Sequence, residues 1–317
     1  MILERKIHNT SDLIYLINSS IFQRRPNFPY SFLNSRSNGP QEVWASLTNQ
    51  KIKNRTVIVG KNESTWPEKN SKVVVVKDFL SVLPNPLIER LKDCKLRLGP
   101  NIDFSLDSNR VIYNNFTDKK VLVPSSWITP YLAHKTGISA RDVQVWVSGI
   151  DEEEWEKKSN SKKVSHKVLL YMKGNNDKDL VQQYSSILRK KGFQIEPMVY
   201  GGYKQSEYRK KLAKSKFMIW FGTTESQSIA QFQSWAMDVP TLVQKQELFI
   251  ENSFQFKASS SPYLSEFTGD FFEHNSNPEE VIDAWLNKIE IFEPRDWLRQ
   301  NHTIELAFEN LKVLFNT

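Results

Sequence analysis

Residues 216–243, KFMIWFGTTESQSIAQFQSWAMDVPTLV, constrain the fold of this chain more than any other segment. An apolar run, FMIWF, ends in the small polar loop GTTESQS, a helix-like segment follows, and VPTLV then has the composition of a second strand. In an α/β sheet, this order brings backbone N–H groups, a helix dipole and one carboxylate to the sheet edge. Phosphate-bearing ligands bind at such places, so the segment predicts an α/β sheet with a nucleotide-type ligand.

Short β-branched runs alternate with helix-like segments through the first half of the chain. The predicted strands cover residues 56–60, 73–76, 95–101, 120–126 and 143–149, and the predicted helices include residues 42–52 and 127–135. This alternation favours a parallel, doubly wound sheet. We expect an additional helix at residues 11–22, before the first strand.

A polar segment, DEEEWEKKSNSKKVSHK at residues 151–167, is typical of an exposed linker. Strand-like runs then resume at residues 168–172, 193–200, 216–221 and 240–243, with helix-like segments at 180–192 and 205–215. Amphipathic segments at 278–290 and 303–315 close the chain. The pattern predicts two α/β domains that face each other across a cleft and are joined near residues 151–165.

The chain carries 43 Lys and Arg against 36 Asp and Glu, a formal net charge of +7. This surplus favours anionic partners such as nucleotide phosphates, acidic lipids or nucleic acid, but solubility accounts for it equally well. Cys94 is the only cysteine, which excludes an internal disulfide and a thiolate zinc site and fits a reducing cytosol. We see no signal peptide and no run of 18 apolar residues, so we expect a cytoplasmic protein.

Two loops could approach a phosphate. Asn38-Gly39-Pro40 makes a tight turn before a helix, although an ordinary turn is the stronger alternative. Lys173 and Lys178 flank a Gly-Asn-Asn loop after a strand and could neutralise a diphosphate, unless they are merely solvated surface lysines.

Two further loops could contact a sugar or a base. Gly201 and Gly202 follow a strand, and Tyr203 could stack on a base, with a surface tyrosine as an equal alternative. Glu225 could accept hydrogen bonds from sugar hydroxyls, while the amides from Ser226 to Ile229 hold phosphate. The alternative makes Thr224 or Ser226 a helix cap and Glu225 a dipole-favoured acid of the first turn.

The arrangement of Glu225, seven residues, Gln233, and then Ala236 and Pro240 resembles the retaining family 4 glycosyltransferases of GT-B architecture. The pattern in that family is Glu, seven residues, Glu, and then Ala-Met-Ala-x-Gly-x-Pro. Residues 121–155 are similar to the stretch of that family that ends in Gly-Ile-Asp before the domain linker. The resemblance covers most of residues 28–315.

The resemblance implies a GT-B fold with two Rossmann-like domains. Residues 1–155 would form an acceptor domain, residues 156–300 a nucleotide-sugar domain, and residues 301–317 a helix that returns toward the first domain. It also implies a retaining, metal-independent transferase without a cofactor. The donor would be a nucleotide diphosphate sugar, and the acceptor a glycan or a lipid-linked saccharide, with peripheral contact to the inner membrane face.

The resemblance implies catalytic roles for Lys173 and Lys178, which would hold the donor diphosphate, and for Glu225, which would contact the donor sugar. The other donor-binding residues would be Gly39, Gly202, Tyr203, Ser226, Gln227, Ser228, Ile229 and Gln233. Asp177 and Asp179 look like a metal-binding pair, but Lys178 between them favours a solvated loop, and we expect no metal.

Several positions depart from the family pattern. Gln233 replaces a glutamate that grips ribose hydroxyls, Lys173 replaces an arginine, and Ser228 replaces a glycine. The histidine often found in the first domain of the family has no counterpart. Two alternatives therefore stay open: a non-catalytic nucleotide-sugar-binding protein, and a transferase that glycosylates modified bases in DNA, which is less favoured because no basic stripe with interleaved aromatic residues is present.

Overall fold

The computed structural model describes residues 13–22, 39–76, 80–156, 166–174 and 177–317. Contacts divide these residues into two compact units. The first unit contains residues 13–22, Val43–Gly149 and Ile304–Thr317, and the second contains residues 39–42 and Ile150–Thr303. Over the described part of the chain, no helix is both long and apolar enough to cross a bilayer.

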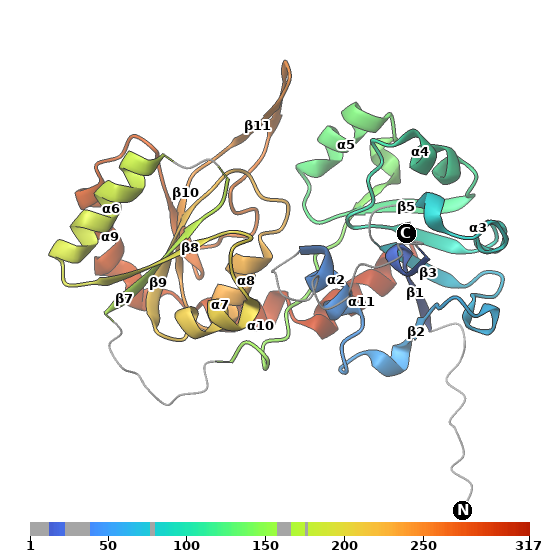
Figure 1. Ribbon diagram of the computed structural model, residues 1–317, viewed down its shortest axis with the longest axis horizontal. Coiled ribbons are helices and arrows are strands. Elements are labelled where there is room, and N and C mark those ends of the chain that lie inside the picture. The colour runs from blue at the N-terminus through green and yellow to red at the C-terminus, as the bar shows by residue number, and fades with distance from the viewer. Residues whose placement is uncertain (1–12, 23–38, 77–79, 157–165, 175–176) are drawn as a thin grey trace, which may run out of the picture. The chain divides into compact units, whose positions relative to one another are not determined.

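The first unit is built on a six-stranded sheet in the order β2-β1-β3-β4-β5-β6, in which every pairing is parallel (Figure 1). Its strands are β1 (Ile14–Asn18), β2 (Thr56–Ile58), β3 (Lys72–Val76), β4 (Lys95–Leu98), β5 (Asp118–Val123) and β6 (Val143–Val145). Its helices are α3 (Asn85–Leu91), α4 (Asp107–Asn114), α5 (Ile128–Thr136) and α11 (Ile304–Leu314), together with most of α2 (Gly39–Leu47).

The helix predicted at residues 11–22 is wrong. Residues Ile14–Asn18 form β1, which lies between β2 and β3 within the sheet. Leu13, Ile14, Leu16 and Ile17 have helix-like spacing in the sequence, but a strand in this place buries Ile14, Leu16 and Ile17 completely, on both faces of the sheet. Tertiary packing therefore overrides the local pattern.

The last helix is anchored within the first unit. The Nε atom of Arg97, on β4, donates to the carbonyl oxygen of Leu314 at the end of α11 at 2.9 Å. The same guanidinium lies over the ring of Phe315, with Cζ 4.8 Å from the ring centroid. Trp146 Nε1 donates to the carbonyl oxygen of Ala307 at 2.8 Å. A cation at a helix C-terminus stabilises the exposed carbonyls there.

The second unit is built on a five-stranded parallel sheet in the order β13-β10-β9-β7-β8 (Figure 1). Its strands are β7 (Lys167–Met172), β8 (Gln194–Val199), β9 (Ser215–Phe221), β10 (Thr241–Gln244) and β13 (Gly269–Phe272). An antiparallel hairpin, β11 (Leu248–Glu251) and β12 (Phe254–Lys257), follows β10 along the chain and precedes β13. Its helices are α6 (Lys178–Lys190), α7 (Gln205–Leu212), α8 (Ile229–Ala236), α9 (Pro278–Lys288) and α10 (Pro294–Asn301).

Helices cover both faces of the second sheet. On one face, α6 and α9 bury Tyr184, Leu188 and Trp285 against alternate strand residues such as Phe217 and Ile219. On the other face, Tyr208 of α7 packs edge-on against Tyr171, whose ring stacks on Trp220 at 4.4 Å. The Tyr208 hydroxyl donates to the carbonyl oxygen of Ala230 in α8 at 2.6 Å. The two parallel sheets with helices on both faces confirm the α/β, doubly wound fold that the sequence predicts.

The predicted linker at residues 151–167 is not uniformly exposed. Trp155 is only 3% exposed, and its ring packs edge-on against Tyr208 of α7 at 5.9 Å. Arg209 lies 5.0 Å from the same ring. Because the neighbours of Trp155 in the sequence are charged, the composition of this segment does not predict that Trp155 is buried.

Candidate functional site

The loops singled out from the sequence meet at the carboxyl edge of the second sheet. Lys173 follows β7, Tyr200 follows β8 and Glu225 lies in the loop after β9. Parallel strands place all three loops at one edge, because their carboxyl ends point the same way. The Lys173 amide donates to the carbonyl oxygen of Phe221 at 2.9 Å, which ties the loops after β7 and β9 together.

Lys173 and Glu225 form an ion pair across these two loops. The Lys173 ammonium contacts both carboxylate oxygens of Glu225 at 2.8 Å. The Glu225 side chain is 5% exposed and that of Lys173 is 28% exposed, so the carboxylate is the buried member and the ammonium faces outward. Both residues are among those predicted from the sequence, but their pairing is not predicted by it.

The pair has a defined electrostatic balance. Burial raises the pKa of Glu225, and the adjacent Lys173 opposes that rise. An ammonium has three N–H donors: one donates to Glu225 Oε2, and the ammonium also lies 2.8 Å from Oε1 as an ion pair, so a further donor remains. The aromatic ring of Tyr200, 43% exposed, lies 4.5 Å from the same ammonium. The exposed side of this pair is therefore cationic and aromatic, which suits a phosphate or a sugar ring.

The start of α8 lies directly after Glu225. Ser226 is exposed, whereas Gln227 and Ser228 are buried, and Ile229 is the first helical residue. The first N–H groups of an α-helix have no partner inside the helix, and the dipole gives this end a positive potential. The helix begins later than the sequence predicts: Ser226 and Gln227 precede it, Ser228 is its N-cap rather than Thr224 or Ser226, and of the four predicted amides only that of Ile229 is helical.

Ser228 adopts a left-handed backbone, with φ 65° and ψ 60°, at the N-cap of α8. Its hydroxyl has no hydrogen-bond partner among the described residues. A left-handed residue favours glycine because it has no Cβ to clash, which explains physically why the family pattern has glycine here.

Lys178 is the first residue of α6 and is exposed. The side chain of Asp177 caps this helix by accepting from the amides of Asp179 and Leu180 at 2.9 and 3.1 Å. The two acids are therefore explained by the start of a helix. Among the residues that the structure describes, no group of three His, Cys, Asp or Glu residues could hold a metal ion.

Tyr203 is buried, at 5% exposure, so it is neither a surface tyrosine nor, as the sequence also allowed, a ring open for stacking on a base. Its hydroxyl lies 2.6 Å from that of Tyr171, and its ring contacts those of Tyr171 and Tyr208. Gly202 is exposed in the turn after β8. The exposed aromatic residue at this strand end is Tyr200, three positions earlier, which the sequence reasoning missed because Gly-Gly-Tyr drew attention to the later residue.

Gly39 is the first residue of α2, and Asn38 lies outside the described residues. Glu42 lies three positions after Gly39 in α2 and belongs to the second unit. Its carboxylate contacts two side-chain amides of the same unit. Gln205 Nε2 donates to Glu42 Oε1 at 2.9 Å, and Gln233 Nε2 donates to Glu42 Oε2 at 3.4 Å. Gln233 itself has no exposed surface. No spacing or motif in the sequence predicts that Glu42 meets Gln233.

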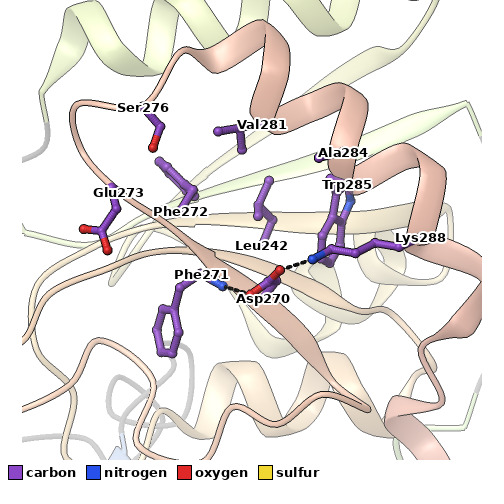
Figure 2. Close-up of a pocket in the computed structure, with 10 residues that line it drawn as sticks. All are labelled: Leu242, Asp270, Phe271, Phe272, Glu273, Ser276, Val281, Ala284, Trp285 and Lys288. Carbon is purple, nitrogen blue, oxygen red and sulfur yellow. Dashed lines mark hydrogen bonds and ion pairs between the residues drawn. The ribbon is translucent and has the colours of Figure 1, made fainter.

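A separate pocket of about 200 Å³ lies between edge strand β13 and helix α9 (Figure 2). Trp285 forms part of its wall, and Lys288 pairs with Asp270 at its rim. Glu273, also at the rim, pairs with Lys245 at 2.9 Å. None of the residues predicted from the sequence lines this pocket, and its charged groups are matched by ion pairs.

No family model and no curated protein matches this sequence, but solved structures do. A glycosyltransferase structure from Rickettsia africae ESF-5 covers 96% of this chain and 98% of its own, with a TM-score of 0.55 and 11% identity. The apo form of the lipopolysaccharide outer core galactosyltransferase WaaB covers 94% and 98%, with a TM-score of 0.49 and 10% identity. The catalytic domain of starch synthase IV from Arabidopsis thaliana, bound to ADP and acarbose, covers 80% and 74%, with a TM-score of 0.48 and 10% identity. The first of these likenesses shows the fold, and the expected GT-B fold is confirmed.

Proposed function

We propose that this chain is a glycosyltransferase that binds a nucleotide-sugar donor at the carboxyl edge of its second sheet. The observation that carries the proposal is the Lys173–Glu225 ion pair, which lies beside the start of α8 at the edge where ligands of open α/β sheets bind. The fold shared with a solved glycosyltransferase supports the same reading.

Each predicted residue receives a role under this proposal. The exposed ammonium of Lys178 and the remaining N–H donor of Lys173 neutralise the donor diphosphate, with the amides from Ser226 to Ile229 beside them. Glu225 fixes Lys173 and accepts from a hydroxyl of the donor sugar. Tyr200, rather than Tyr203, offers an exposed ring for stacking. Gly202 is exposed and has no side chain, so its backbone is accessible to the nucleobase of the donor.

The reaction needs charge stabilisation at the departing group. The bond between the anomeric carbon and the diphosphate oxygen breaks, a bond from that carbon to an acceptor oxygen forms, and the acceptor proton passes to the departing phosphate. We propose retention of configuration on the resemblance to the retaining family 4 glycosyltransferases, and we propose no metal because lysines and helix amides supply the positive potential. A glycan or a lipid-linked saccharide is the proposed acceptor, and the single buried cysteine favours a reducing compartment.

A panel of UDP, ADP and GDP sugars tests the proposal by the release of nucleoside diphosphate. We expect one of these donors to be turned over and Lys178→Ala to slow that turnover about 100-fold, the loss typical of one donor to a developing anion. Lys190→Ala is the matched control, because Lys190 is exposed at the other end of the same helix. Binding of a nucleotide sugar without release would favour the non-catalytic alternative. Equal rates in both variants would remove Lys178 from the site.

A further inference from the structure

The carboxylate of Glu42 is held between two side-chain amides of the second unit. Gln205 donates to one of its oxygens at 2.9 Å and Gln233 donates to the other at 3.4 Å. Gln233 is completely buried, whereas Glu42 keeps part of its surface accessible. A ligand can therefore reach Glu42, and Gln233 lies behind it.

Gln233 fits this place because it is neutral. A glutamate at position 233 would bring a second carboxylate about as close to Glu42 as the amide nitrogen now lies, and two carboxylates at that distance do not both stay ionised. Burial already raises the pKa of Glu42, and the hydrogen bond from Gln205 opposes the rise. The amide and the carboxylate thus form a matched pair.

The capacity that remains at the Glu42 carboxylate and at Gln233 Oε1 is acceptor, while each amide nitrogen carries a second N–H group. An ionised carboxylate has several lone pairs and no donor, so the two hydrogen bonds that Glu42 accepts from side-chain amides leave some of its acceptor sites unfilled. The Oε1 atom of Gln233 has no hydrogen-bond partner among the described residues. The cluster therefore attracts O–H groups and repels phosphate.

We infer that the Glu42 carboxylate accepts hydrogen bonds from a vicinal pair of hydroxyls on the bound nucleotide sugar, and that Gln233 and Gln205 are positioning residues that hold it. This inference rests on the proposed function. In a nucleotide sugar, vicinal hydroxyls occur on the ribose and on the transferred sugar, and both present the same chemistry to Glu42. Gln233, at the second position of the family motif, then acts through the carboxylate of Glu42, which lies 191 residues earlier in the sequence.

Calorimetric titration with paired ligands tests the inference. UDP is compared with 2′-deoxy-UDP and ADP with 2′-deoxy-ADP, so that each pair differs in one ribose hydroxyl. For the nucleotide that binds, we expect the ribonucleotide to bind at least about tenfold more tightly, which is the range of one hydrogen bond to a charged group. In Glu42→Gln this preference falls toward equality, while Glu279→Gln, a change at an exposed acid of α9, keeps it.

A charge exchange separates positioning from folding. Gln233→Glu alone should weaken binding, because it crowds two carboxylates, and the double variant Glu42→Gln with Gln233→Glu should recover part of the ribose preference. A merely structural role would not move the ratio of ribonucleotide to deoxynucleotide affinity. Glu42→Asp provides a conservative variant should Glu42→Gln fail to fold.

A second comparison identifies the sugar that Glu42 contacts. If Glu42→Gln leaves the ribose preference intact but abolishes the extra affinity of UDP-glucose over UDP, the hydroxyls belong to the transferred sugar, and the inference stands. If neither ratio changes in Glu42→Gln, the inference is overturned although the proposed function survives. GDP and 2′-deoxy-GDP are titrated in the same way, and if the wild-type chain binds none of the three ribonucleotides, the proposed function fails and this inference fails with it.

Discussion

Replacement of Lys173 by methionine tests the ion pair at the centre of the site. The change keeps an unbranched side chain of similar length but removes the cation, so Glu225, 4% exposed, is left buried without its partner. Breaking a buried ion pair from one side costs about 3–5 kcal/mol. The partial exposure of Lys173 lets water approach, so we expect the lower end of that range.

Protonation of Glu225 sets an upper limit on this cost, and the limit depends on pH. Starting from the ordinary carboxyl pKa of 4.5, neutralising Glu225 costs about 3 kcal/mol at pH 7 and less than about 1 kcal/mol at pH 5. A carboxyl whose folded pKa is raised favours folding below that pKa, and this contribution is lost as pH rises through it. The deficit of Lys173→Met should therefore be largest above pH 7 and shrink toward pH 5.

Urea unfolding, followed by tryptophan fluorescence at pH 5, 6, 7 and 8, measures this deficit. Lys167→Met is the matched control: Lys167 is the first residue of β7, the strand that Lys173 follows, and it pairs with Glu196 at 2.7 Å, but both side chains of that pair are about 30% exposed. An exposed pair is worth about 0–1 kcal/mol. The double variant Lys173→Met with Glu225→Gln should recover most of the lost stability. A deficit below about 1 kcal/mol at pH 8, or one that does not vary with pH, would refute the reasoning.

Two further changes test local physics. Ser228→Gly should raise the free energy of unfolding by up to about 1 kcal/mol, because it relieves the left-handed backbone at φ 65°, whereas Ser228→Ala keeps the Cβ and should not; equal urea midpoints would contradict this. Burial lowers the pKa of His302 to about 4, from an ordinary 6.5, so the unfolded chain takes up the proton first as the pH falls. Stability should then decrease by about 3 kcal/mol between pH 6.5 and 4 on account of this group. His302→Phe, which keeps an aromatic ring against Phe232, should flatten that part of the pH profile, and an unchanged slope would show that other groups produce it.

The sequence predicted the strands of both sheets where β-branched and aromatic residues form continuous buried runs. β3, β7 and β9 are of this kind, and their continuous apolar runs located them. β1 was missed because its apolar residues are spaced as in a helix, and only the neighbouring strands decide its conformation. The buried Trp155 was missed for a related reason, because one aromatic residue carries little weight among charged neighbours.

The candidate site was predictable where it follows chain order and unpredictable where it depends on long-range contacts. Lys173, Lys178 and the start of α8 follow strand ends, so strand prediction also placed them at one sheet edge. The pairing of Lys173 with Glu225, the burial of Tyr203 and the meeting of Glu42 with Gln233 depend on side-chain packing between distant segments. No spacing rule in a single sequence reports such contacts.

Hydrogen exchange with and without saturating nucleoside diphosphate tests most directly whether the carboxyl edge of the second sheet is the binding site. For the UDP or ADP that binds, we predict slower amide exchange in peptides covering residues 171–181 and 222–232, and unchanged exchange in peptides from the pocket beside β13 and α9. Protection confined to that pocket or to the first unit, with the loops after β7 and β9 exchanging as before, would contradict the account.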